Sequence, residues 1–258
     1  DGPTAAITGG AGMVQVDETA GVQGGSDDDT TATAVSDLFS GLTGTSTDLP
    51  TEQYATSSAS LVDTTGSGYG ADEENGTTKL SLEINGSAGL DSGLETTGGT
   101  QIFLYESGDL IVGRIGNEVG DGTDTANAGG TIAFAVAIDE DSGIVSTAQY
   151  ASITNPTPGA SHDEVANLTG KINAKVTVTD GDLDTATQTT DIGDQIKFSD
   201  DGPTMFAAMP AIVVNSGDAL GDGLLNFLAN TGTDGLGDVV FDSALEGGTL
   251  TGTINMVV

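Results

Sequence analysis

KINAKVTVT, residues 171–179, places an apolar side chain at every second position. Ile172, Ala174, Val176 and Val178 alternate with polar residues, which is the period of a strand with one face in a core and the other in water. A helix would instead repeat its apolar positions every three to four residues. This stretch therefore predicts a half-exposed β-strand.

Two further stretches, residues 79–84 and 131–138, show the same alternation. Their predicted inward side chains are Leu80, Leu82 and Ile84 in the first stretch, and Ile132, Phe134, Val136 and Ile138 in the second. Alanines lie between the inward residues of the second stretch, so its other face is only weakly polar. Both stretches are predicted as strands of one core.

Short strands dominate the rest of the chain, and helical signals are thin. Turn residues at 106–109 and 139–143 predict two hairpins. Short helices are predicted at 35–42 and 224–229. Further strands are predicted at residues 13–16, 101–105, 109–115, 144–150, 195–198, 211–214, 238–241 and 249–257. This pattern predicts an all-β fold, an antiparallel β-sandwich of the immunoglobulin-like or cadherin-like kind, and not a βαβ arrangement.

The tetrapeptide Asp-Gly-Pro-Thr occurs twice, at residues 1–4 and 201–204. Proline fixes φ and glycine allows backbone angles that other residues resist, so a repeated Gly-Pro indicates a reused joint between modules. Residues 1–200 are therefore predicted to form one complete repeat with expanded loops, and residues 201–258 to begin a second one. The long loops are expected at 21–33, 57–78 and 116–130.

The chain carries 39 Asp and Glu against 5 Lys and Arg, for a formal net charge of −34. Binding to nucleic acid or to an anionic membrane surface requires clustered basic residues, and here they are scattered. Cysteine is absent, which excludes disulfides and thiolate metal sites, and no apolar run is long enough to span a bilayer. Divalent cations, chiefly Ca²⁺, are the expected partner of so many carboxylates. A halophilic protein with a salt-solvated acidic surface is the alternative.

The strongest candidate for a metal site is the turn that follows residues 171–179. Asp180, Asp182 and Asp184 occupy alternate positions there, so their carboxylates can converge on one cation. The spacing is similar to the first half of a helix-loop-helix calcium loop, but Thr185 replaces the usual glycine and the flanking segments are strands. We therefore predict a metal site made of carboxylates, but not a helix-loop-helix calcium loop. The alternative is a solvated acidic turn.

A second set of candidate ligands lies at the predicted joint between modules. Asp200 and Asp201 precede the second Gly-Pro, as Asp1 precedes the first, and Asp17 and Glu18 follow the first predicted strand. Carboxylates on both sides of a joint predict a calcium clamp that cancels repulsion and removes hinge freedom. Alternatively, each of these residues caps a turn.

Other candidate residues favour ordinary structural roles. Asp139 and Asp141 lie in a predicted hairpin turn, where turn formation explains them. His162 is the single histidine and there is no cysteine, so a zinc site of the usual kind is excluded and a solvated loop residue is expected. No set of nucleophile, base and orienting residue emerges, and the chain is not expected to be an enzyme.

Four short motifs together carry a resemblance to a known family. They are Val16-Asp17-Glu18-Thr19, Gly89-Leu90-Asp91-Ser92-Gly93-Leu94, residues 178–186 from Val178 to Ala186, and residues 198–204 from Phe198 to Thr204. In this order they resemble the repeat domains of giant RTX-type adhesins and related large surface proteins exported by bacterial type I secretion systems.

The resemblance implies a tandem β-sandwich that folds outside the cell on meeting calcium. It maps the acidic turn to Asp180, Asp182 and Asp184, and the joint to Asp200, Asp201 and Pro203. Leu183 departs from the family pattern, which has a glycine at that position.

The leading functional hypothesis is a non-catalytic, calcium-stabilised extender repeat of a long extracellular or cell-surface adhesin or fibre, used in adhesion, biofilm cohesion or a cell-surface filament. Its partners would be neighbouring repeats of the same polypeptide and, if another copy completes residues 201–258, other chains in a fibre. Neither nucleic acid nor membrane insertion is expected. The alternative is a glycan-binding or host-surface-binding module, which would need a concave site with exposed aromatic residues.

Overall fold

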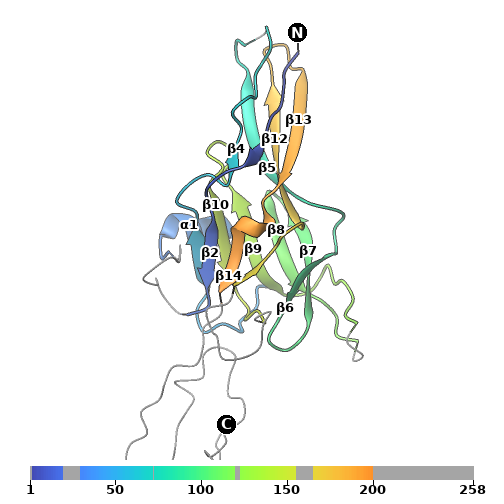
Figure 1. Cartoon of the computed structure of the whole chain (residues 1–258). Helices are drawn as coiled ribbons and strands as arrows, with labels where there is room; N and C mark the ends of the chain where they lie inside the picture. The colour runs from blue at the N-terminus through green and yellow to red at the C-terminus, as the bar shows by residue number, and fades with distance from the viewer. Residues whose placement is uncertain (1, 20–29, 72, 120–122, 155–164, 200–258) are drawn as a thin grey trace, which may run out of the picture.

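The computed structural model describes residues 2–19, 30–71, 73–119, 123–154 and 165–199 (Figure 1). This part of the chain is all-β and sandwich-like, as predicted, with one short α-helix and one 3-10 turn, Gly193–Gln195. Among the residues described, no helix is long and apolar enough to cross a membrane. The predicted second repeat, residues 201–258, lies outside the described part, so the proposed division into repeats stays a prediction.

One layer of the fold is a six-stranded sheet in which every neighbouring pair is antiparallel. Its strands, in spatial order, are β3 (Gln53–Thr56), β10 (Val145–Gln149), β9 (Ile132–Ile138), β8 (Leu110–Ile115), β7 (Gln101–Ser107) and β6 (Leu90–Glu95).

Three smaller sheets complete the fold. The first, in spatial order, contains β13 (Thr185–Asp191), β12 (Ile172–Thr179) and β5 (Thr77–Ile84). The second contains β11 (Val165–Asn167), β14 (Ile196–Ser199) and β2 (Val14–Asp17), and the third pairs β1 (Thr8–Gly9) with β4 (Val62–Asp63). Strand β5 packs on β7, β8 and β9, while the upper half of the β13–β12–β5 sheet projects beyond the six-stranded sheet (Figure 1).

The main core lies between these layers. Ile172, Ala174, Val176 and Val178 are fully buried in it, which confirms the alternation predicted for residues 171–179. They share one cluster with Phe134, whose ring lies 4.9 Å from that of Phe198 in β14. Burying a side chain of this kind contributes about 1.5–3 kcal/mol, so this core accounts for much of the stability.

A second apolar cluster covers the outer face of the six-stranded sheet. Helix α1 (Thr33–Phe39) packs Val35 and Phe39 onto it, and the Phe39 ring stacks on Tyr54 at 6.2 Å. The helix predicted at 35–42 is therefore present, but it begins two residues earlier and ends three residues earlier than predicted. Its packing explains why β9 has alanines on its second face, since both faces of this strand are buried.

The inward set predicted for β9 is wrong at one residue. Phe134 and Val136 face the main core as expected, but Ile132 belongs to the outer cluster under α1. The pairing of β8 with β9 shifts register between Gly113 and Arg114, where Phe134 and Ile132 are the respective partners. This irregularity places an extra residue in β9 and exchanges the two faces, which a strict alternation cannot anticipate.

The expected antiparallel pairing holds for every ladder between described strands except one. β14 runs parallel to β2, with Ile196 opposite Val14 and Ser199 opposite Asp17. These two strands come from opposite ends of the described chain. Their pairing closes the fold, and it lies at the end of the molecule away from the β12–β13 hairpin (Figure 1).

All eight strands predicted in the described part are present within one or two residues of their expected bounds. Six strands were not predicted: β1, β3, β4, β6, β11 and β13. The strands predicted at 211–214, 238–241 and 249–257, and the helix predicted at 224–229, lie outside the described residues.

Candidate metal centre

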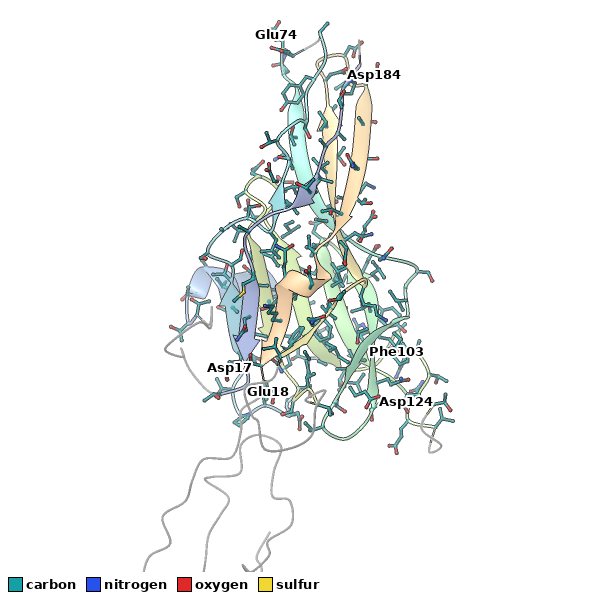
Figure 2. The ribbon with its side chains drawn as sticks, in the orientation of Figure 1. Asp17, Glu18, Glu74, Phe103, Asp124 and Asp184 are labelled. Atoms are coloured by element: carbon teal, nitrogen blue, oxygen red, sulfur yellow. The ribbon has the colours of Figure 1, made fainter. Side chains whose placement is uncertain are left out.

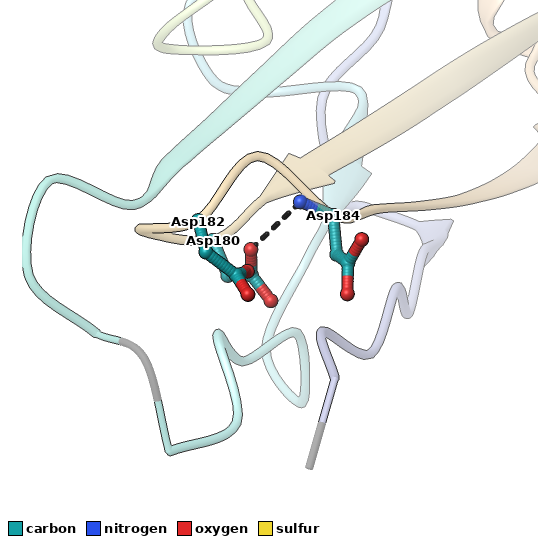
Figure 3. A group of neighbouring side chains, drawn as sticks. All are labelled: Asp180, Asp182 and Asp184. Atoms are coloured by element: carbon teal, nitrogen blue, oxygen red, sulfur yellow. Dashed lines mark hydrogen bonds between the residues drawn. The ribbon is translucent and has the colours of Figure 1, made fainter.

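The acidic turn forms the tip of the β12–β13 hairpin. Thr179 pairs with Thr185, and the backbone N–H of Asp180 donates to the carbonyl of Asp184 at 3.1 Å. The Asp180 carbonyl accepts from the N–H of Leu183 at 3.2 Å, which closes the turn. Asp180 Oδ1 also accepts a 2.9 Å hydrogen bond from the Asp184 N–H, drawn as the dashed line in Figure 3. The first aspartate therefore organises the tip through its backbone and its side chain.

Leu183 has a left-handed backbone at this tip, with φ of 75°. Its side chain is 77% exposed and gains little from packing. A non-glycine residue in this conformation is strained, because its Cβ approaches the backbone. Glycine, which the RTX resemblance led us to expect at this position, would adopt this backbone conformation without strain.

The three carboxylates meet on one side of the tip. One oxygen each from Asp180, Asp182 and Asp184 lies within 4.8 Å of the other two (Figure 3). Calcium binds oxygens at 2.3–2.6 Å, so oxygens that share one ion are separated by up to about 5 Å. The spacing therefore fits three ligands around a single cation, as the sequence predicted.

Asp180 carries a buried oxygen with no hydrogen-bond partner. The residue is only 1% exposed, and while Oδ1 bonds to the turn, Oδ2 is unsatisfied. Burial raises the pKa of the Asp180 carboxyl above its usual value, and the nearby Asp182 carboxyl raises it further. No basic side chain in the described part of the chain forms an ion pair with these three aspartates. A cation at the tip would satisfy both the buried oxygen and the charge.

The other predicted ligands in the described part lie elsewhere. Glu18 is only 2% exposed, and its Oε1 accepts hydrogen bonds from Gln149 Nε2 at 2.7 Å and from the Ile153 N–H at 2.6 Å. Asp17 is also buried, and it pairs with Ser199 across the β2–β14 ladder. Figure 2 shows both residues at the end of the molecule opposite Asp184. The structure does not bring them together with the aspartate cluster.

Asp200 and Asp201 lie outside the described residues, as does His162. The β2–β14 pairing places Asp17 beside Ser199, the residue before Asp200. Asp17 therefore lies beside the last described residue before the predicted joint. Shared calcium binding by Asp17, Glu18, Asp200 and Asp201 stays a prediction.

The buried polar network around Glu18 was not anticipated from the sequence. It includes Gln149, which is fully buried in β10 and whose Oε1 has no hydrogen-bond partner. A glutamine within the otherwise apolar and small-residue stretch at 144–150 was the available signal. The network fixes the end of β2 against β10 through side-chain hydrogen bonds.

The turn between β9 and β10 has the simple structural role that was predicted. Asp139 Oδ1 accepts hydrogen bonds from Ser142 Oγ and the Ser142 N–H, both at 2.7 Å, and from the Asp141 N–H at 3.2 Å. Lys79 Nζ reaches across from β5 to Glu140 at 2.7 Å and to Asp141 at 2.8 Å. All three acidic residues of this turn thus have partners within the chain.

The sequence of the chain matches one known protein family. Residues 13–193 match the family described as a domain of unknown function, DUF5801. The match covers more than half of the chain, and the chain belongs to this family. No curated protein and no solved structure matches it.

Proposed function

We propose that the chain is a non-catalytic, calcium-stabilised extender repeat of a long secreted or cell-surface bacterial adhesin or fibre protein. The observation that carries this proposal is the unsatisfied, buried Oδ2 of Asp180 within a cluster of three carboxylates. An uncompensated buried carboxylate is costly, and a bound cation removes that cost. Metal binding would therefore stabilise the folded state directly.

Calcium is the cation that suits these ligands best. The cluster offers only carboxylate oxygens, which are hard ligands, and the chain has no cysteine for a softer metal. Two of the three aspartates are exposed, so carbonyls and waters can complete six to eight ligands around Ca²⁺. Mg²⁺ needs near-ideal octahedral geometry and keeps most of its waters, which suits a turn of this kind less well.

The charge of the whole chain supports the same role. A net charge of −34 makes the compact state repel itself, and bound divalent ions would reduce that repulsion where carboxylates gather. Folding would then depend on the calcium concentration outside the cell. Type I secretion in an unfolded state, as the RTX resemblance implies, is compatible with such dependence.

The placement of the ends of the fold supports an extended array. The N-terminus and the aspartate cluster lie at one end of the described structure, and Asp17 and Glu18 lie at the other (Figures 1 and 2). Repeats joined through the Gly-Pro segments would therefore follow one another along the long axis. Calcium at the joint residues Asp200 and Asp201 would stiffen such a rod, with neighbouring repeats as partners.

Isothermal titration calorimetry of the full chain with CaCl₂ tests the proposal. The wild-type chain is expected to bind calcium, and a variant with Asp180→Asn, Asp182→Asn and Asp184→Asn is expected to bind at least one ion fewer. Asp109→Asn, in the β7–β8 turn, is the matched control and should bind as the wild type does. Equal calcium stoichiometry in the triple variant and the wild type would remove this site from the proposal.

A further inference from the structure

The exposed edge of β13 is unlike the other strand edges of the fold. Residues 185–190 read Thr-Ala-Thr-Gln-Thr-Thr and carry no charge, in a chain whose net charge is −34. β13 pairs only with β12 among the described strands, and it forms the margin of the projecting sheet in Figure 1. Its side chains are exposed or half-buried along the whole strand.

The hydrogen-bond alternation shows which backbone groups face outward. Asp180 bonds to Asp184, and the N–H of Ile192 donates to the carbonyl of Ile172, so even-numbered residues of the second strand bond to β12. Thr185, Thr187 and Thr189 must then direct their N–H and C=O groups away from the sheet. In the described part of the chain no backbone group pairs with them.

Other sheet edges carry the features that block strand addition. β5 has Lys79 and Glu83 in ion pairs, and its Leu80 N–H donates to the Glu140 carbonyl at 2.9 Å. β6 has a register shift between Asp91 and Glu95, and β3 is four residues long. Charges, bulges and short length are the usual protection of an edge. β13 has none of these between residues 185 and 190, and it contains no proline.

We propose that β13 is a self-association surface that pairs antiparallel with β13 of a second copy of this chain. A two-fold axis at Thr187 would place Thr187 opposite its own copy and Thr185 opposite Thr189 of the second copy. Cross-strand Thr–Thr pairs are favourable in antiparallel sheets. The two β13–β12–β5 sheets would then join into one continuous sheet.

The same register avoids opposed charges. Asp191 would lie opposite Leu183 of the second copy and Asp184 opposite Thr190, so no two carboxylates face each other directly. Both carboxylate oxygens of Asp191 already accept hydrogen bonds within their own chain, from the Gly170 and Gly193 N–H groups. In this register the strand is therefore self-complementary in charge, which argues for a second copy over a basic or acidic partner strand.

Single-cysteine variants of the full chain test this pairing, because the natural chain has no cysteine. In the proposed register the two Thr187 Cα atoms would lie about 5.5 Å apart, within the range for a disulfide. Under mild oxidation at physiological salt, with calcium present, Thr187→Cys is expected to form a covalent dimer. Thr77→Cys, an exposed residue on the opposite edge of the same sheet, is the matched control and should form far less. Equal dimer formation by the two variants would overturn the proposal.

A mixing experiment tests the register. Thr185→Cys and Thr189→Cys chains should cross-link efficiently with each other and poorly with themselves. Sedimentation velocity adds a measurement without cysteine: Thr187→Lys, which places like charges at the axis, should lower the dimer fraction, whereas Thr77→Lys should not. If Thr187→Lys sediments as the wild type does, self-pairing through β13 is wrong. These readouts do not depend on calcium affinity, so they can fail while the proposed extender role stands, and the reverse also holds.

Discussion

Two hairpin turns in this fold are both rich in aspartate, but they differ in how their negative charge is compensated. In the β9–β10 turn, Asp139 caps its own backbone and Lys79 neutralises Glu140 and Asp141. In the β12–β13 turn, the described chain supplies no cation, and Asp180 keeps a buried oxygen without a partner. An acidic turn is thus a metal candidate only when the fold itself leaves its charge uncompensated.

The difference originates in neighbouring strands. β5 lies beside the β9–β10 turn and carries Lys79 on its outward face, where the side chain spans to the turn. The β12–β13 tip projects beyond the body of the fold (Figure 2), and among the described residues no basic side chain forms an ion pair with its aspartates. With five Lys and Arg in the whole chain, most carboxylates must find compensation outside it.

The largest expected difference between the two turns is their response to calcium. Free calcium at 100 times its dissociation constant should stabilise the wild-type chain by about 2.7 kcal/mol, and the Tm should rise accordingly. Asp180→Asn should abolish most of that rise while keeping an acceptor for the Asp184 N–H. Asp139→Asn should leave it intact. Thermal unfolding with calcium and with EDTA measures this, and an equal calcium response in both variants would remove the distinction.

Backbone strain separates the two tips by a smaller amount, because the left-handed residue is Gly143 in the β9–β10 turn and Leu183 in the β12–β13 turn. Leu183→Gly should stabilise the fold by about 0.5–1 kcal/mol, because glycine adopts the left-handed conformation without a steric cost. Asn75→Gly is the matched comparison: Asn75 also has positive φ, at 66°, but asparagine tolerates it better, so the gain should be smaller. Urea unfolding in EDTA measures both changes. A destabilised Leu183→Gly chain would show that the leucine side chain contributes contacts that outweigh the strain.

Removing the charge of Lys79 should leave the β9–β10 turn without a counter-charge, as the β12–β13 turn is. Lys79→Met keeps the apolar stem and leaves Glu140 and Asp141 unpaired, so a small fall in Tm is expected that shrinks as salt rises. Both carboxylates are exposed, and no calcium response comparable to that of the Asp180 turn should appear. Melting curves at low and high NaCl check this. A large loss of stability at high salt would mean that Lys79 acts through packing instead of charge.

The smallest expected effect is the pH dependence of the Asp139 turn. Hydrogen bonds from Ser142 hold the pKa of the Asp139 carboxyl below its usual value of 3.8. A carboxyl with a lowered folded pKa stabilises the fold above its unfolded pKa and loses that contribution as pH falls through the folded pKa. Asp139→Asn should therefore flatten the acid limb of the stability curve below about pH 4. Chemical unfolding of the wild type and the variant from pH 2 to 7 measures this, with Asp109→Asn as the control. An acid limb of the Asp139→Asn curve that matches the wild type would contradict the prediction.

Alternation in the sequence predicted the strands that bury one apolar face. β5, β12 and the hairpins around 106–109 and 139–143 follow from side-chain period and turn residues. β13 was missed because its seven residues include no large apolar side chain, and it is a strand only because β12 lies beside it. β6 was missed because it contains Asp91, Ser92 and Gly93 and an irregular register.

The candidate site was predictable in part. The spacing of Asp180, Asp182 and Asp184 was sufficient to predict that they converge, since alternate positions of a tight turn lie on one side. The unsatisfied oxygen of Asp180 was not predictable, because the burial of a side chain depends on tertiary contacts that the spacing of residues does not show. The burial of Glu18 escaped prediction for the same reason, since Gln149 and Ile153 bind it from β10 and the segment after it.

The parallel pairing of β2 and β14 has a mechanical consequence. Tension applied through the two ends of the described chain would draw these neighbouring strands past each other along their length. Their ladder hydrogen bonds lie across that direction, so all of them would have to rupture together, whereas an antiparallel hairpin pulled from its open end loses them one at a time. The β2–β14 ladder, Val14–Asp17 with Ile196–Ser199, would thus be loaded in shear and would resist unfolding of the sandwich under tension.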